Sequence, residues 1–168
     1  YVGGQEGEVT IAIDGATGEK LAAIPSGYFA IEMCYNPISN KIYSVNYYDD
    51  NMTVIDGATN QVAANVPLGW AHYSMCFDSH DNRVYVANYY DNNVAAVDGI
   101  TDSILAIVPV GDQPSFVVYD SRDNRVYCAN ELGSSLSVID CSTNTVIATV
   151  NVGGTPKVLC YNPTDNKV

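Results

Sequence analysis

The chain has 168 residues, of which 47% are hydrophobic and 15% are charged, and its formal net charge at pH 7 is -12. This composition supplies enough apolar material for a core and argues against a disordered chain. The excess of carboxylates repels phosphate backbones and anionic membranes, so neither nucleic acid nor membrane insertion is expected. No apolar run approaches the ~20 residues that cross a bilayer.

The sequence repeats every 42 residues. The motif Asn-Lys/Arg-Val/Ile-Tyr begins at Asn40, Asn82 and Asn124, and a fourth copy is divided between Asn166–Val168 and Tyr1–Val2. Repeats of ~40–45 residues that contain several short strands are typical of β-propeller blades. The expected fold class is all-β, a single β-propeller domain over residues 1–168 with four repeats of four strands each.

The strands can be placed in chain order from alternating β-formers and turn residues. The third strand of each of the first three repeats is predicted at Val9–Ile13, Met52–Ile55 and Val94–Val97, and each is followed by an Asp that begins a turn. The last repeat shows all four strands, at Pro114–Tyr119, Arg125–Asn130, Leu136–Ile139 and Thr145–Val150. No segment keeps a 3.6-residue period, so no helix is predicted.

Five cysteines, an odd number, do not make a disulfide framework. Cys34, Cys76 and Cys160 share one position of the repeat, where the remaining repeat has Val118. A position that accepts Val or Cys is typical of a small apolar core site, so the cysteines are predicted to be buried free thiols. No C-x-x-C motif is present to support a zinc or haem site.

Three runs carry a family resemblance: Tyr43-Ser44-Val45-Asn46, Tyr85-Val86-Ala87-Asn88 and Tyr127-Cys128-Ala129-Asn130. With the spacing from Gly111 to Pro114, they resemble the YVTN-type β-propeller repeat of archaeal surface-layer and other exported or cell-surface proteins. The resemblance implies a propeller fold and an extracellular or cell-surface location, but no single activity. Three positions depart from the pattern. Gly4 stands where the other repeats have the last Asn of the motif, and Ala30 and His72 stand where the last complete repeat has Pro114.

The repeat boundaries predict how the blade is completed. With the strands of a blade called A (innermost) to D, residues 1–24 should supply B to D of one blade and residues 156–168 should supply A and part of B. These ends can close one chain into a four-bladed ring, or join two chains into an eight-bladed homodimeric ring with two-fold symmetry, which is favoured. A longer array or a filament is the remaining alternative.

The loops between strands B and C and between strands D and A should share one face of a propeller. They concentrate the residues predicted to bind a ligand: Tyr28, Phe29, Tyr47, Tyr48, Asp49, Trp70, His72, Tyr89, Tyr90 and Asp91. Exposed Tyr and Trp favour protein or carbohydrate contact, although such rings can also pack between blades. The Asp/Asn oxygens of the same loops could attract Ca²⁺, but turn formation explains them as well, and no metal or cofactor is predicted.

We therefore expect a non-enzymatic structural or recognition module outside the cell that binds protein or glycan. No G-x-S-x-G, H-E-x-x-H or phosphate-loop motif occurs, and the two histidines, His72 and His80, should lie on opposite faces. A propeller enzyme of lactonase or oxidoreductase type is the first alternative. A repeat unit of an extracellular filament or surface layer is the second, and DNA binding is disfavoured by the charge.

Overall fold

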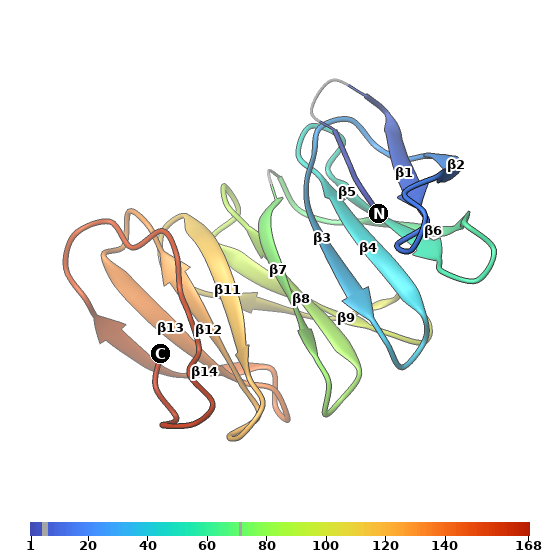
Figure 1. The fold of residues 1–168 in the computed structure, drawn as a ribbon. Coiled ribbons are helices and arrows are strands. Elements are labelled where there is room, and N and C mark those ends of the chain that lie inside the picture. Colours follow the sequence, from blue (N-terminus) through green and yellow to red (C-terminus); the bar gives the residue numbers. More distant parts are fainter. Residues whose placement is uncertain (5–6, 71) are drawn as a thin grey trace.

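The computed structural model describes residues 1–4, 7–70 and 72–168, except for the side chain of His72. All regular elements of the described residues are β-strands, arranged as one two-stranded and three four-stranded antiparallel sheets (Figure 1). Blade one has β1 (Val9–Ile13) and β2 (Lys20–Pro25). Blade two has β3 (Ala30–Asn36), β4 (Lys41–Asn46), β5 (Asn51–Asp56) and β6 (Gln61–Pro67). Blade three has β7 (His72–Asp78), β8 (Arg83–Asn88), β9 (Asn93–Asp98) and β10 (Ile104–Pro109). Blade four has β11 (Pro114–Asp120), β12 (Arg125–Asn130), β13 (Ser135–Asp140) and β14 (Thr145–Asn151).

Within each complete blade the strands follow one another in sequence order, and their turns use the predicted Asp and Asn residues. At the turn after β5, for example, the Asp56 carboxylate accepts the backbone N–H groups of Ala58 and Thr59 at 2.9 Å each. Asn40, Asn82, Asn124 and Asn166 all have a positive φ, between 51° and 54°, which Asn tolerates better than most residues. The repeated motif therefore encodes a tight turn.

The blades form an open arc. The first strands of neighbouring blades contact each other, β3 with β7 and β7 with β11, so these strands line the inside of the arc (Figure 1). The two termini lie at opposite ends of the arc in this view. The described residues thus do not form the four-bladed single-chain ring that the sequence left open. In the described part of the chain there is also no helix of the length and apolarity that a membrane crossing requires.

Each end of the chain forms only part of a blade. Val2 forms an isolated bridge with Ile11, so the first residues add the start of a strand to the β1–β2 sheet. At the other end, residues 152–168 have one isolated bridge, between Asn162 and Lys167. Three complete blades lie between these two partial ones.

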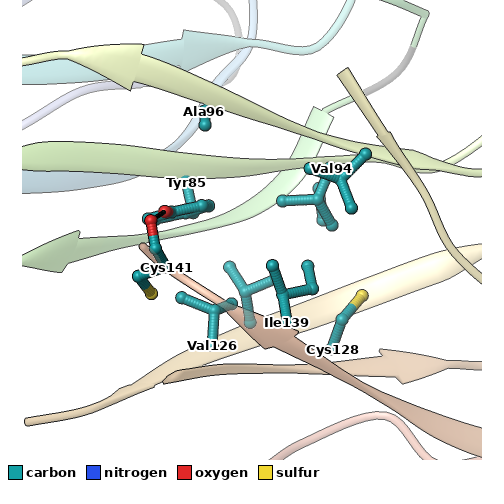
Figure 2. Close-up of a cluster of buried hydrophobic side chains, with 10 residues drawn as sticks. Tyr85, Val94, Ala96, Val126, Cys128, Ile139 and Cys141 are labelled. Atoms are coloured by element: carbon teal, nitrogen blue, oxygen red, sulfur yellow. Dashed lines mark hydrogen bonds between the residues drawn. The ribbon is translucent and has the colours of Figure 1, made fainter. Parts of the chain in front are cut away.

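The hydrophobic core lies between adjacent blades. Figure 2 shows one cluster, in which Tyr85 and Val94 of blade three face Val126, Ile139 and Cys141 of blade four. All five side chains have a relative accessibility of 0%. Each central strand buries side chains on both faces, because a blade packs against a neighbour on either side.

A hydrogen-bonded contact accompanies the core at each blade junction. The Tyr85 hydroxyl donates to Asn144 Oδ1 of the next blade at 2.8 Å, and Tyr43 makes the equivalent contact with Asp102 Oδ1 at 3.3 Å. Tyr1 likewise donates to Asn60 Oδ1 at 2.5 Å. A cation adds to two of the junctions: Lys41 Nζ lies 2.8 Å from Asp102 Oδ2, and Arg83 donates to the Cys141 carbonyl. The Tyr43 and Tyr85 rings are fully buried between blades, whereas the equivalent Tyr127 is only half-buried.

All five cysteines are free, and their burial differs from the prediction at three of them. Cys128 and Cys141 are buried, and desolvation raises the pKa of the Cys141 thiol to about 12. Cys34 and Cys76 are half-buried, and desolvation together with the charge of Glu32 raises the pKa of the Cys34 thiol to about 11. Cys160 is exposed, because its segment is not paired into a blade.

Candidate functional site

The predicted loop face is built on a buried Asn at the end of the second strand of each complete blade. Asn46 Nδ2 donates to Asn51 Oδ1 at 2.7 Å and to Thr53 Oγ1 at 2.9 Å, which fixes the connection between β4 and β5. The loop between β2 and β3 also lies directly against the Asn46 side chain, because a Cβ added to Gly27 of this loop would lie 2.4 Å from Asn46 Nδ2. The amide therefore holds both loops of the face in one geometry.

The two predicted carboxylates each connect the two loops of their own blade. Asp49 Oδ2 accepts the backbone N–H of Tyr28 at 2.6 Å, and Asp91 Oδ2 accepts that of Trp70 at 2.6 Å. The repetition of the same bond in blades two and three indicates that these carboxylates position the aromatic residues. One oxygen of each carboxylate therefore accepts a hydrogen bond from the loop backbone.

The aromatic side chains of blades two and three form one continuous series of ring contacts. Within blade two, the Tyr47 and Tyr48 centroids lie 4.7 Å apart, and those of Tyr28 and Tyr48 lie 5.7 Å apart. Within blade three, Tyr89 and Tyr90 are separated by 5.1 Å, and Trp70 and Tyr90 by 5.2 Å. Such separations are typical of paired aromatic rings.

Tyr73 joins the two groups of rings. Its centroid lies 5.6 Å from that of Tyr47 and 4.5 Å from that of Tyr89. We refer to the whole set as the aromatic surface: Tyr28, Phe29, Tyr47, Tyr48, Trp70, Tyr73, Tyr89 and Tyr90. Tyr73, in strand β7, was absent from the predicted site residues. Its position one residue after His72 was the available signal.

Part of the aromatic surface is open to solvent and part supports it. The exposed fractions are 60% for Trp70, 58% for Tyr48 and 49% for Tyr90, whereas Tyr47 and Tyr89 are half-buried beneath them. Desolvation raises the pKa of Tyr47 well above its usual value, and hydrogen bonding with the Tyr90 and Tyr73 hydroxyls adds to the increase. Tyr47 therefore stays protonated at neutral pH and can both donate and accept hydrogen bonds.

Phe29 occupies an unusual backbone conformation within this surface. Its φ is +63°, and the equivalent residue of the next but one repeat, Gln113, has a φ of +53°. A bulky residue in the left-handed region is uncommon, and such outliers tend to occur at functional loops. Both repeats thus keep the same left-handed loop conformation, although it strains the backbone at Phe29 and Gln113.

Blade four has a different character on this face. Glu131 and Leu132 stand where the tyrosine pairs occur in blades two and three, and Glu131 Oε1 forms an ion pair with Lys157 Nζ at 2.9 Å. Desolvation, followed by the Glu131 charge, raises the pKa of Tyr89, so this ion pair borders the aromatic surface. The aromatic surface is therefore confined to blades two and three.

A polar hollow of about 530 Å³ adjoins the blade-two end of the aromatic surface. It is lined by Pro25, Ser26, Gly27, Asp49, Asn51, Gln61, Val62 and Asn65. Asp49 lines the hollow and also accepts the backbone N–H of Tyr28, so the hollow and the aromatic surface are contiguous. Amide, hydroxyl and carboxylate groups beside flat apolar rings can bind a ligand that has both hydroxyl groups and C–H faces.

The histidines contribute little to the described site. The side chain of His72, a predicted site residue, lies outside the described set. His80 is at the opposite end of β7, where its Nδ1 lies 3.0 Å from Asp81 Oδ1. In the part of the chain that the structure describes, no three His, Cys, Asp or Glu side chains converge as metal ligands would.

Comparison with solved structures identifies the architecture. A functionally unknown protein from Desulfotomaculum acetoxidans superimposes with a TM-score of 0.76 at 14% identity, over 94% of this chain and 53% of its own. Hydrazine synthase from Kuenenia stuttgartiensis superimposes with a TM-score of 0.71 at 18% identity, over 76% of this chain and 37% of its own. The fold is a β-propeller-like repeat fold.

At these identities the similarity concerns the fold alone. The chain spans about half, or less, of the length of these structures. No known protein family and no curated protein matches the sequence.

Proposed function

We propose that this chain is a non-enzymatic recognition module of the YVTN propeller type, located outside the cell or on its surface. Its ligand, a carbohydrate or a protein, binds on the aromatic surface. The observation that carries the proposal is the uninterrupted series of ring contacts from Tyr28 through Tyr73 to Trp70. The YVTN membership and the location rest on the sequence resemblance.

The aromatic surface has the properties of a binding platform rather than of a core. Exposed apolar side chains that occur singly need no explanation, whereas a contiguous exposed group indicates an interaction surface. Tyr and Trp lose little conformational entropy on binding and offer a flat face with a polar tip. Asp49 and Asp91 each join the two loops of a rigid blade that carry these rings, so the platform is pre-formed.

Carbohydrate is the ligand class that the surroundings favour. The polar hollow supplies Asp49, Asn51, Gln61 and Asn65, whose planar amides and carboxylate suit sugar hydroxyl groups. The net charge of -12 disfavours acidic partners. A neutral or basic saccharide therefore fits better than an anionic one.

We also propose that the chain self-associates to complete its ring, as a homodimer; a filament or surface-layer array is the alternative assembly. The rival function is a propeller enzyme of lactonase or oxidoreductase type. One structural neighbour is a hydrazine synthase, but 18% identity transfers the fold and not the activity.

A glycan array probed with the intact chain, followed by calorimetric titration of the best saccharide, tests the ligand proposal. Trp70→Ala and Tyr48→Ala should each weaken binding by at least about tenfold, as expected when a large aromatic contact residue is truncated. Tyr35→Ala is the matched control, because Tyr35 is also exposed, at 54%, but lies at the opposite end of β3. Equal affinity in all three variants would refute the site.

A further inference from the structure

In blade two, the aromatic surface presents an exposed pair of rings beside a carboxylate. Asp49 Oδ2 accepts the backbone N–H of Tyr28 at 2.6 Å, so the carboxylate and the Tyr28 ring belong to one loop contact. The Tyr28 and Tyr48 rings lie 5.7 Å apart with their planes inclined by 31°, and Tyr47 meets Tyr48 edge-on at 4.7 Å and 89°. We call Tyr28, Tyr48 and Asp49 the blade-two subsite.

Blade three repeats this arrangement at the equivalent positions of the next repeat. Asp91 Oδ2 accepts the backbone N–H of Trp70, again at 2.6 Å. The Trp70 and Tyr90 rings lie 5.2 Å apart with their planes inclined by 42°, and Tyr89 meets Tyr90 edge-on at 5.1 Å and 90°. Trp70, Tyr90 and Asp91 form the blade-three subsite, which has nearly the same geometry as the blade-two subsite.

The two subsites are neighbours on one continuous surface. The Tyr73 ring connects them, 5.6 Å from Tyr47 and 4.5 Å from Tyr89. In blade four, Leu132 and Gly133 stand where a ring and a carboxylate would be needed, so among the described residues the arrangement occurs in blades two and three alone. Two like subsites side by side suit a ligand whose own units repeat.

The charge around the subsites is negative and is not neutralised by the protein. Asp49, Asp50 and Asp91 are exposed, and in the described part of the chain none of them forms an ion pair. Lys157 is the one basic residue among those described at this end of the strands, and it is paired with Glu131 at 2.9 Å. The other basic residues lie at the turns on the opposite end of the strands: Lys20, Lys41, Arg83, Arg122, Arg125 and Lys167.

An ammonium group is the ligand feature that this surface attracts most strongly. The face of a Trp or Tyr ring attracts a cation, with Trp the strongest, and a nearby carboxylate adds a direct Coulomb attraction. A sugar ring also offers a rigid apolar face that packs on flat aromatic rings. A lysine side chain carries the same charge but loses more conformational freedom on binding, which favours an amino sugar over a basic peptide.

We propose that the ligand is a linear saccharide with free amino groups, and that two of its units occupy the blade-two and blade-three subsites. Each unit packs its ring on the exposed aromatic pair and directs its ammonium group to the carboxylate beside that pair. The polar hollow next to Asp49 accommodates hydroxyl groups of the chain as it continues. The inference rests on the proposed carbohydrate binding and specifies the charge and the repetition of the ligand.

Calorimetric titration of the 168-residue chain with a glucosamine hexamer, and with the same hexamer N-acetylated, tests the charge. Acetylation converts each ammonium group to a neutral amide and leaves the sugar backbone unchanged. The glucosamine hexamer should bind about tenfold more tightly, because two exposed ammonium contacts contribute about three- to fivefold each. This preference should shrink as salt is added, since exposed charges are screened.

The possible outcomes separate this inference from the proposed function. Equal affinity for the two hexamers, or tighter binding of the N-acetylated one, would overturn the inference and leave carbohydrate binding standing. Failure to bind any saccharide of a glycan array would refute the proposed function itself. A lysine hexamer is the third probe, and its binding more tightly than the glucosamine hexamer would assign the surface to a basic protein instead.

Substitution of the carboxylates tests which groups hold the ammonium. Asp49→Asn and Asp91→Asn remove the charge but keep an oxygen that can accept the loop N–H, so the rings stay in position. Each should weaken binding of the glucosamine hexamer about threefold and leave that of the N-acetylated hexamer unchanged. Asp56→Asn is the matched control, because the Asp56 carboxylate also accepts backbone N–H groups but lies at the opposite end of β5. Equal effects of all three substitutions would refute the assigned contacts.

The length of the saccharide tests the pairing of the two subsites. A glucosamine dimer should bind at least about tenfold more weakly than the hexamer, because the longer chain makes its second contact at a high effective concentration. Equal affinity of dimer and hexamer would show that one subsite is enough and would overturn the two-subsite assignment.

Discussion

The glycine before each complete blade is predicted to be irreplaceable, and Gly111 is the clearest case. A Cβ on Gly111 would lie 2.5 Å from Asn130 Nδ2, 2.6 Å from its Cγ and 2.9 Å from its Cβ. Asn130 is 0% exposed and donates to Ser135 Oγ and Ser137 Oγ at 3.0 Å each. Relief of the overlap must therefore move a buried side chain and break at least one of these bonds.

The expected cost of Gly111→Ala is about 2–4 kcal/mol, the sum of core overpacking, about 1–3 kcal/mol, and about 1 kcal/mol for each lost hydrogen bond. Urea unfolding measures it, and with a slope of about 1–3 kcal/mol/M the midpoint should fall by about 1–2 M. Gly7→Ala is the control, because its added Cβ would meet only ordinary contacts at 3.7 Å or more. In an Asn130→Ala background the same substitution should cost much less, since the overlapping side chain is gone. Equal midpoints for Gly111→Ala and Gly7→Ala, or additive effects in the double variant, would refute this reasoning.

Three further results are expected. Tyr85→Phe should lower the free energy of unfolding by about 1 kcal/mol, because the hydroxyl bonds the next blade from a fully buried ring; an unchanged urea midpoint would contradict the junction contact. Ellman's reagent should modify Cys160 rapidly in the dissociated native chain and Cys128 only after unfolding, because burial raises the pKa of the Cys128 thiol; rapid loss of both thiols would show that the blade is open. The backbone N–H of Thr101 lowers the pKa of Asp98, so this carboxylate stabilises the fold above its unfolded pKa of about 3.9, and the stabilisation is lost as the pH falls through the lower folded value. Urea unfolding of Asp98→Asn at a series of pH values should therefore show a shallower acid decline than wild type, and an identical decline would exclude this role.

The architecture was predictable from the sequence because the repeat carries it locally. Arg125–Asn130 is the observed strand β12, and Leu136–Ile139 falls short of β13 by one residue at each end. Alternation and turn residues define such elements without knowledge of the rest of the chain. The ends of strands depend on the pairing partner, which the sequence does not show directly.

The site was predictable only in part. The loop position identified most of the aromatic residues, but the link through Tyr73 depends on the rotation of blade three relative to blade two. The repeat period gives no information about that rotation. The hydrogen bonds by which Asp49 and Asp91 hold the neighbouring loops were not predicted either. A loop carboxylate looks the same in the sequence whether it binds a ligand or a backbone N–H.

The burial of Cys160 was predicted wrongly for a related reason. Its equivalents Cys34 and Cys76 lie in strands β3 and β7, whereas the Cys160 segment is not paired with a second strand. Repeat equivalence predicts the environment of a residue only where the neighbouring strands are present. The same limit explains why Tyr127 is less buried than Tyr43 and Tyr85.

Trp70 allows the central claim, that the aromatic surface binds the ligand, to be measured directly. It is the one tryptophan of the chain, it is 60% exposed, and its ring lies 5.2 Å from that of Tyr90. Its fluorescence therefore reports on this surface alone. Titration with the saccharide selected by the array should change the Trp70 emission saturably and protect it from acrylamide quenching, with the dissociation constant found by calorimetry. Calorimetric binding that leaves both the emission and the quenching of Trp70 unchanged would contradict the account.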